Sequence, residues 1–133
     1  MIERAIVEDG EDIEELENLL FDNSLNANSI KRELELGEGF VVRDLDQVLV
    51  GYVLTRSAGG WLDITRLGVK STQQGKGIGR LLLRAVYTLH PELPIMLTVL
   101  SNNTVARALY ASEGFTIRSW LPQGNAIVLE KAR

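Results

Sequence analysis

The segment from Leu67 to Leu83, LGVKSTQQGKGIGRLLL, constrains the fold more than any other part of the chain. An apolar run ends in a loop that holds Gly75, Gly77 and Gly79, and an apolar pattern with helical spacing follows directly. A strand that passes through glycines straight into a helix directs successive backbone N–H groups, and the positive end of the helix, at one place. The segment therefore predicts an anion site of the kind that binds phosphate.

Three phosphate-binding patterns can be compared with this loop. The P-loop pattern G-x-x-x-x-G-K-S/T fails, because Lys70 stands where the first glycine is needed and Gly77 where Ser or Thr is needed. The dinucleotide pattern G-x-G-x-x-G fails, because Arg80 takes the place of its last glycine. The third pattern, Q/R-x-x-G-x-G/A, is met by Gln74, Gly77 and Gly79.

A second motif lies at residues 103–115, which read NTVARALYASEGF. Asn103, Ala106 and Tyr110 belong to the spacing N-x-x-A-x-x-L-Y-x-x-x-G-F, which ends in Gly114 and Phe115. A strand pattern precedes the asparagine, and a helical pattern carries the alanine and the tyrosine. The motif therefore predicts a strand, a helix and a further strand in succession.

The chain as a whole predicts an α+β fold in a single domain, residues 1–133. Helical periodicity favours helices over residues 11–21, 29–36, 78–89 and 104–112. Alternating and β-branched residues favour strands over residues 2–7, 40–43, 47–55, 61–69, 95–100, 116–121 and 126–131. This order predicts a mostly antiparallel sheet with one β-α-β unit, and a length of 133 residues fits one domain.

The two motifs together resemble those of the GNAT superfamily of acetyl-CoA-dependent N-acetyltransferases, and the resemblance spans about residues 2–131. It implies a GNAT-like fold, a twisted, mixed and mostly antiparallel sheet of about seven strands flanked by four helices. It also implies that acetyl-CoA is the acyl donor. The donor-binding residues implied in this way are Leu67, Gly68, Val69, Gln74, Gly75, Lys76, Gly77, Ile78, Gly79, Arg80 and Asn103. A backbone N–H in this set, which we place at Leu67, would polarise the thioester carbonyl as an oxyanion hole does.

The same resemblance implies two catalytic residues. Tyr110 stands where the family often carries the general acid that protonates the departing thiolate. Asp63 stands where many members carry a glutamate base, and it is shorter by one methylene; direct action, action through water and a structural role all stay open. Thr98 takes the position of the glutamate that the ribosomal-protein N-terminal acetyltransferases use, which argues against that branch.

Composition excludes several kinds of site. The chain has no cysteine and one histidine, which excludes disulfides, an acetyl-cysteine intermediate, a thiolate zinc site and a multi-histidine metal centre, so no metal is expected. The net charge of −4 argues against nucleic-acid binding, which needs a basic patch. No apolar run reaches the roughly 20 residues of a membrane helix, and the N-terminus does not read as a secretory signal. A cytoplasmic protein is therefore expected.

The expected function is transfer of an acetyl group from acetyl-CoA to a primary amine, on a small molecule or a peptide, by direct attack in a ternary complex. Twelve of the 18 acidic residues fall within the first 40 positions. They form either solvated helix faces or a wall that attracts a cationic acceptor, such as a polyamine. The alternative function is an acyl-CoA-binding sensor or interaction module without catalysis, and a weaker one is a nucleotide-phosphate binder. Dimers are common in the family, so a homodimer is among the expected assemblies.

Overall fold

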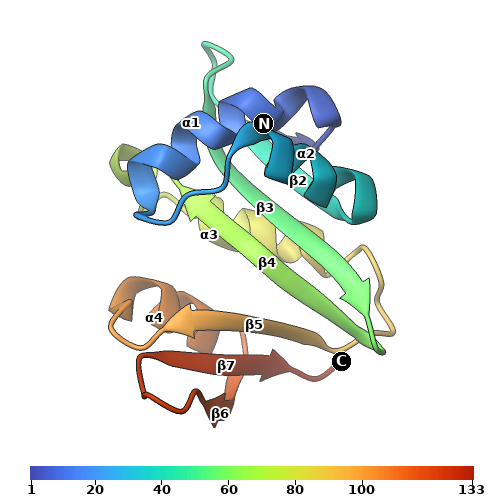
Figure 1. Cartoon of the computed structure of the whole chain (residues 1–133), viewed down its shortest axis with the longest axis vertical. Coiled ribbons are helices and arrows are strands. Elements are labelled where there is room, and N and C mark those ends of the chain that lie inside the picture. Colours follow the sequence, from blue (N-terminus) through green and yellow to red (C-terminus); the bar gives the residue numbers. More distant parts are fainter.

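Seven strands form one sheet, and helices cover both faces of it (Figure 1). The structure is a computed structural model that describes residues 1–133. The strands are β1 (Ile2–Arg4), β2 (Glu38–Arg43), β3 (Leu49–Ala58), β4 (Trp61–Val69), β5 (Ile95–Leu100), β6 (Thr116–Trp120) and β7 (Ala126–Lys131). Their order across the sheet is β1-β2-β3-β4-β5-β7-β6, and every neighbouring pair except β4 and β5 is antiparallel. The predicted fold class, with its mixed and mostly antiparallel sheet, is confirmed.

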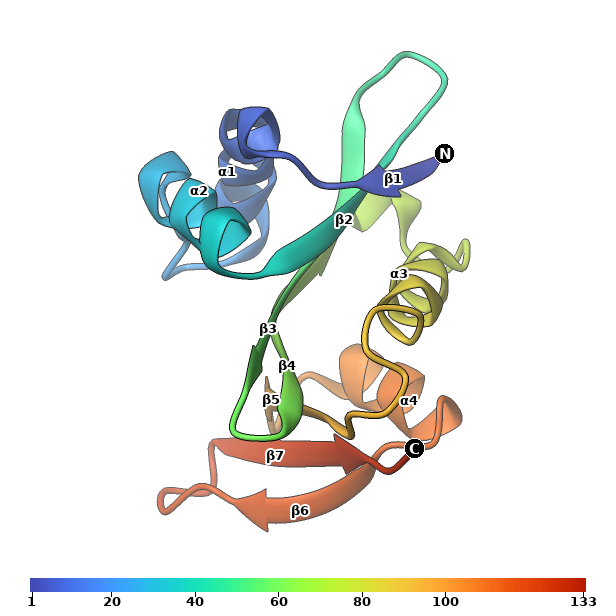
Figure 2. The ribbon, with the colours of Figure 1, turned by 90° about the vertical axis from the view of Figure 1, so that its right-hand side faces the viewer.

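Four helices cover the two faces in pairs, as Figure 2 shows. The helices α1 (Gly10–Leu20) and α2 (Ala27–Leu36) lie on one face, and α3 (Ile78–Val86) and α4 (Thr104–Ser112) lie on the other. Each pair buries its apolar stripe in a separate hydrophobic cluster. The helical residues buried there are Ile13, Leu16 and Ile30 in the first cluster and Leu82, Leu83, Val86 and Tyr110 in the second. The four predicted helices are thus confirmed, each with apolar residues packed against the sheet.

Several element boundaries differ from the sequence prediction by one to three residues, and three of them have clear local reasons. The first strand ends at Arg4 rather than at residue 7, because the chain turns into a 3-10 helix in which the Asp9 carboxylate accepts the Ile6 N–H at 2.9 Å. Helix α2 begins two residues earlier than predicted, where the Asn26 side chain caps it. Helix α3 ends at Val86 rather than at residue 89, because the N–H groups at 88 and 89 bond three residues back.

The parallel strands β4 and β5 separate partway along their length, and this gap positions the site. Their pairing ends at Ile64, whereas β4 continues beside β3 to its last residue. The Lys70 N–H donates to the Val50 carbonyl of β3 at 2.8 Å. Because the direction of the N–H groups alternates along a strand, Leu67 and Val69 turn their N–H and C=O groups away from β3 and into the gap.

Candidate active site

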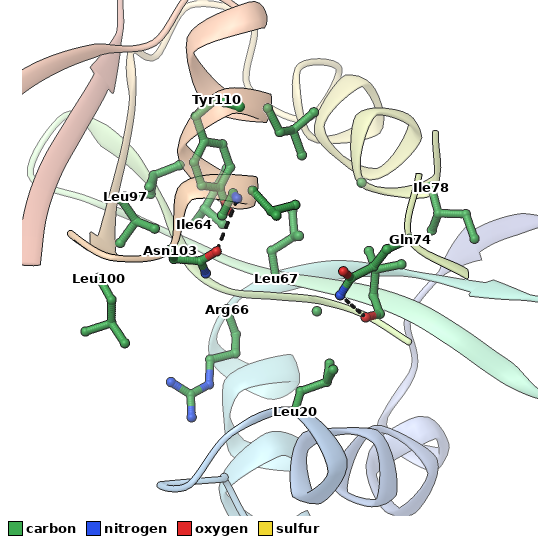
Figure 3. A pocket seen from close by; sticks show the side chains of 18 of the residues that line it. Leu20, Ile64, Arg66, Leu67, Gln74, Ile78, Leu97, Leu100, Asn103 and Tyr110 are labelled. Atoms are coloured by element: carbon green, nitrogen blue, oxygen red, sulfur yellow. Dashed lines mark hydrogen bonds between the residues drawn. The ribbon is translucent and has the colours of Figure 1, made fainter. Parts of the chain in front are cut away.

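A cavity of about 1070 Å³ lies between the separated ends of β4 and β5 (Figure 3). Its walls are the ends of the two strands, the loop before α3, the first turn of α3, one side of α4 and the loop after α1. The predicted site residues that line it are Leu67, Gly68, Val69, Gln74, Gly75, Gly77, Ile78, Gly79, Arg80, Asn103 and Tyr110. The structure therefore brings residues of both sequence motifs to one cavity.

The loop before α3 presents unpaired backbone N–H groups. Within residues 75–80 no N–H donates a hydrogen bond to the rest of the protein, and no side chain caps α3. Gly75 and Gly77 have φ values of 81° and 82°, in the left-handed region that favours glycine. A Cβ on Gly79 would lie 2.9 Å from the Leu109 side chain, so this glycine lets α3 approach α4. Free N–H groups at the start of a helix suit the oxygens of a phosphate.

Three polar side chains surround this loop, and neighbouring groups hold each of them. The Gln74 side-chain amide donates to the Val69 carbonyl at 3.2 Å. The Arg80 guanidinium pairs with the Glu113 carboxylate. The Asn103 side-chain oxygen caps α4 by accepting a backbone N–H at 3.2 Å, which leaves the Asn103 Nδ2 free to donate into the cavity. Further hydrogen-bond donors thus accompany the backbone groups on this side of the cavity.

Tyr110 reaches the cavity from α4, on the face that α3 and α4 cover. Its side chain is 6% exposed, and its ring meets that of Phe115 edge-on with the centroids 5.6 Å apart. The hydroxyl has no hydrogen-bond partner and is not among the fully enclosed polar atoms, so it faces the cavity. Burial raises the pKa of Tyr110 to about 12. The phenol is therefore protonated at neutral pH and can donate a hydrogen bond.

Two predicted site residues, Asp63 and Lys76, do not line the cavity. Asp63 lies near the start of β4, opposite Arg56 on β3 and Met96 on β5. Partial burial raises the pKa of the Asp63 carboxyl above its ordinary value. Lys76 is exposed on the loop before α3. The structure thus places both side chains outside the space that the other site residues share.

The side of the cavity nearest α1 contains residues that the sequence motifs did not identify. The end of α1 contributes Leu20 and the loop after it Phe21, while Arg66 extends towards them from β4 (Figure 3). The Arg66 guanidinium lies over the Phe21 ring, 4.7 Å from its centroid, and pairs with the buried Glu17 carboxylate of α1. The sequence contains two signals that could have indicated this pair. Arg66 is an arginine inside an apolar strand pattern, and Glu17 is a glutamate at helical spacing from Ile13.

The cavity carries no acidic wall. No carboxylate or imidazole lines it, and its charged residues are Arg66 and Arg80. Six of the twelve carboxylates of the acidic N-terminal region are instead paired with basic side chains. These pairs join Asp9 and Asp12 to Arg43, Glu11 to Lys31, Glu17 to Arg66, Glu33 to Arg56 and Glu38 to Arg4. The cavity surface therefore offers no acidic side chain to a cationic acceptor.

The charged side chains outside the cavity form no second centre of this kind. No group of three or more His, Asp or Glu side chains is arranged to hold a metal ion. The one histidine, His90, lies outside the cavity, with its Nε2 2.9 Å from the Glu38 carboxylate. None of the helices combines the length and the apolar character needed to cross a bilayer.

Comparison with known proteins agrees with this geometry. The profile of the Acetyltransferase (GNAT) family matches residues 8–115. No curated protein sequence matches the chain. Among solved structures, the ribosomal-protein-S18-alanine N-acetyltransferase from Escherichia coli superposes with a TM-score of 0.85 and 18% identity, over 98% of this chain and 92% of that chain.

Two further solved structures give the same result. The PaiA N-acetyltransferase from Thermoplasma acidophilum, in complex with coenzyme A, has a TM-score of 0.81 and 19% identity over 100% of this chain and 99% of its own. The IAA acetyltransferase from Bacillus cereus ATCC 14579 has a TM-score of 0.78 and 24% identity over 98% of this chain and 97% of its own. At these identities the likeness concerns the fold, which the three proteins share with this chain.

Proposed function

Because the chain belongs to the acetyltransferase (GNAT) family and is an acyltransferase, we propose that it transfers the acetyl group of acetyl-CoA to a primary amine by direct attack in a ternary complex. The amine nitrogen forms a bond to the thioester carbonyl carbon, the carbon–sulfur bond breaks, and a proton leaves the nitrogen as the thiolate departs. The observation that carries the proposal is the cavity, which joins the free N–H groups of the loop to an open face beside α1.

The unpaired backbone N–H groups support binding of acetyl-CoA, the acyl donor, along one side of the cavity. We assign its pyrophosphate to the N–H groups of residues 75–80, with Gln74 and Arg80 beside them in the cavity wall and Lys76 exposed on the same loop. We assign its extended arm to the edge of β4 at residues 67–69, where backbone groups face the gap, and to the free amide of Asn103. Extended backbone edges bind extended amide-containing chains in the way that strands pair.

Two groups near the gap support the chemical step. The Leu67 N–H is the proposed donor to the thioester oxygen, because a fixed N–H stabilises the negative charge that develops there. Tyr110 is the proposed donor to the departing thiolate. Its pKa of about 12 lies above the ordinary thiol value near 8.5. Hydrogen-bond donation, rather than complete proton transfer, is therefore the role that the acidity of this phenol supports.

The attacking amine must be neutral, and no base lines the cavity. We propose that Asp63 accepts the amine proton through water. Two features support this assignment: the position of Asp63 on β4, and the burial that raises the pKa of its carboxyl and so makes its carboxylate a stronger base than an exposed one. Transfer of the proton to bulk water through the open cavity is the alternative.

The sensor hypothesis predicts the same donor binding without turnover, and one experiment separates the two. CoA release is measured with a panel of primary amines, and acetyl-CoA affinity is measured by calorimetry, for the parent protein and for Tyr110→Phe. We expect kcat to fall roughly 10- to 100-fold in Tyr110→Phe while the acetyl-CoA Kd stays within about twofold, because the lost hydrogen bond acts on the leaving group.

The matched control is Tyr87→Phe, which also removes one tyrosine hydroxyl. Tyr87 lies outside the cavity, where its hydroxyl donates to Glu113 at 3.1 Å. The Tyr87→Phe substitution should leave kcat unchanged within about twofold. Tight acetyl-CoA binding with no turnover on any amine would support the sensor, and an unchanged kcat in Tyr110→Phe would remove this residue from the mechanism.

We also propose that residues 1–133 act as one N-acetyltransferase domain in the cytoplasm. The cavity supports the single domain, because its walls draw on residues from Leu20 to Ala126. Neither half of the chain could form the site alone.

A further inference from the structure

A buried carboxylate and a cavity-lining arginine form a network on the α1 side of the cavity. The Glu17 side chain is fully buried, yet it carries a carboxylate. It accepts hydrogen bonds from the Tyr52 hydroxyl, from the Leu25 N–H at 2.9 Å, and from Arg66 Nε at 3.0 Å and Nη2 at 3.1 Å. Burying a charge is unfavourable unless it is paired and hydrogen-bonded, and Glu17 meets both conditions.

The network fixes the Arg66 guanidinium but leaves one nitrogen free. Nε and Nη2 bond to Glu17, and Nη2 also donates to the Asn23 carbonyl at 2.8 Å. The plane of the guanidinium is further set by the Phe21 ring, 4.7 Å away. Nη1 has no partner in the protein and is not among the fully enclosed polar atoms. A guanidinium nitrogen of this kind keeps two N–H donors, and Arg66 is among the residues that line the cavity.

The charge that a ligand meets on this side is positive. Glu17 does not line the cavity, whereas Arg66 does, so the ion pair has its positive end towards the cavity. The other charged residue of the cavity, Arg80, lies at the loop before α3 and is paired with Glu113. Figure 3 shows Arg66 on the α1 side of the β4 backbone and Tyr110 on the opposite side. Arg66 is therefore separate from the groups assigned to the acyl donor.

We infer that the acceptor amine carries a carboxylate and that Arg66 Nη1 binds this carboxylate. The inference rests on the proposed function and places the acceptor at the open face of the cavity beside α1. Arg66 directly precedes Leu67, the proposed oxyanion donor, so a carboxylate on Nη1 would hold the amine close to the gap. Hydrogen bonds between a guanidinium and a carboxylate are among the stronger ones in proteins. The carboxylate belongs either to a free amino acid or to an acidic side chain near the amine of a peptide.

Matched acceptors test the inference directly. The first arm compares free amino acids with their amides, and the second compares dipeptide amides that have Asp or Asn in the second position. We expect kcat/KM for CoA release to be roughly 10- to 100-fold higher for the carboxylate member of one of these pairs. The arm that shows the preference identifies the source of the carboxylate, and equal rates in both arms with active amines would overturn the inference.

A binding measurement makes the test independent of turnover. N-acetyl amino acids, the products of the first arm, and the Asp- and Asn-containing N-acetyl dipeptide amides are titrated by calorimetry into the protein with CoA, together with their carboxyl-free partners. A carboxylate-dependent affinity without turnover would support Arg66 as the binding residue and contradict the transfer reaction. Turnover with no carboxylate preference would contradict the inference and keep the transfer reaction.

The variant is the double substitution Arg66→Gln with Glu17→Gln, which removes both charges and so leaves no unpaired buried charge. The preference for the carboxylate should fall to within about threefold, while the acetyl-CoA Kd stays unchanged. The matched control is Arg56→Gln with Glu33→Gln, because this pair also joins the sheet to a helix but lies outside the cavity. A preference that survives in the Arg66 double variant would overturn the inference.

Discussion

The two sides of the cavity are built from different parts of the chain. The donor side, around residues 74–80, offers mainly backbone N–H groups, which glycines with positive φ leave uncovered. The acceptor side, beside α1, offers side chains, and an ion pair with the fully buried Glu17 holds Arg66, the charged one, in place. One side therefore depends on the absence of side chains, and the other depends on two particular side chains that meet across the fold.

This difference gives the two sides different sensitivities to substitution. An added side chain at Gly75 or Gly77 changes what can bind and displaces no contact of the fold, because nothing lies within 4 Å of its Cβ; its cost to the fold is the backbone strain of a positive φ. A lost charge on the acceptor side leaves its partner, the fully buried Glu17 or the mostly buried Arg66, without a counter-charge, which costs stability before binding is considered. Substitutions on the donor side should thus change mainly the affinity for acetyl-CoA. Substitutions on the acceptor side should change mainly the free energy of unfolding.

The largest expected effect is that of Glu17→Gln on stability. The substitution keeps the shape of the side chain but removes the charge that faces Arg66 and the Tyr52 hydroxyl. Breaking one partner of a buried pair costs roughly 3–5 kcal/mol, and because the amide still accepts one hydrogen bond we expect the lower end, roughly 3 kcal/mol. Urea denaturation at pH 7 measures the loss as a lower midpoint with an unchanged slope.

The control for this variant is Glu11→Gln, on the same helix. Glu11 pairs with Lys31 at 2.6 Å, but its side chain is 64% exposed. Solvent screens exposed ion pairs, which therefore contribute little to stability, so this variant should shift the midpoint little. Equal losses in the two variants would show that burial does not distinguish the acceptor-side pair from an ordinary surface pair.

The second effect in size concerns the affinity of the donor side. Gly77→Asp puts a carboxylate where the structure directs free N–H groups, so we expect the acetyl-CoA Kd to rise roughly 100-fold, or by about 2.7 kcal/mol. Gly60→Asp is a closely matched control. Gly60 has φ of 84° against 82° for Gly77, and neither glycine has an atom within 4 Å of its Cβ position. Calorimetry that finds the same Kd in both variants would remove the loop from the donor site.

The same contrast explains which part of the site could be predicted from the sequence. A site made of backbone groups needs glycine at set positions in a continuous segment, and Gly75 and Gly77 are visible as such in the sequence. The acceptor side needs Glu17 to meet Arg66, and 49 positions separate them. In the sequence, each of them is only a charged residue within an apolar pattern. Such a pattern does not identify the residue with which the charge pairs.

The fold shows the same limit. Periodicity predicted each helix and strand, because an apolar stripe is a local property of the sequence. The gap between β4 and β5 depends instead on long-range register: the pairing of the two strands stops at Ile64, and β4 bulges against β3 at the next residue, Thr65. Asp63 lies just before this point. Its position in the sequence therefore could not show whether its carboxylate reaches the cavity.

The smallest expected effect is that of Asp63→Asn on stability. It tests whether the acceptor side of the cavity lacks titratable groups. Burial raises the pKa of Asp63 in the folded protein, so the folded state holds its proton to a higher pH than the unfolded chain. The stability linked to that proton is present at low pH and is lost as the pH rises through the folded pKa. Asp63→Asn should therefore raise Tm by about 1–2 °C at pH 7, and by less as the pH falls towards 4. The control Asp46→Asn, which removes a carboxylate from an exposed turn, should leave Tm at pH 7 within about 1 °C of the parent value.

The activity of Asp63→Asn decides between the roles left open for this residue. A carboxylate outside the cavity reaches the amine only through water, and we expect kcat/KM to fall less than about 10-fold. A base in direct contact with the amine contributes roughly 100-fold or more. A loss of that size, with the acetyl-CoA Kd unchanged, would mean that Asp63 enters the cavity when both substrates are bound. The acceptor side would then carry a titratable group of its own, and an amine with a high pKa would become as suitable an acceptor as one that is already neutral.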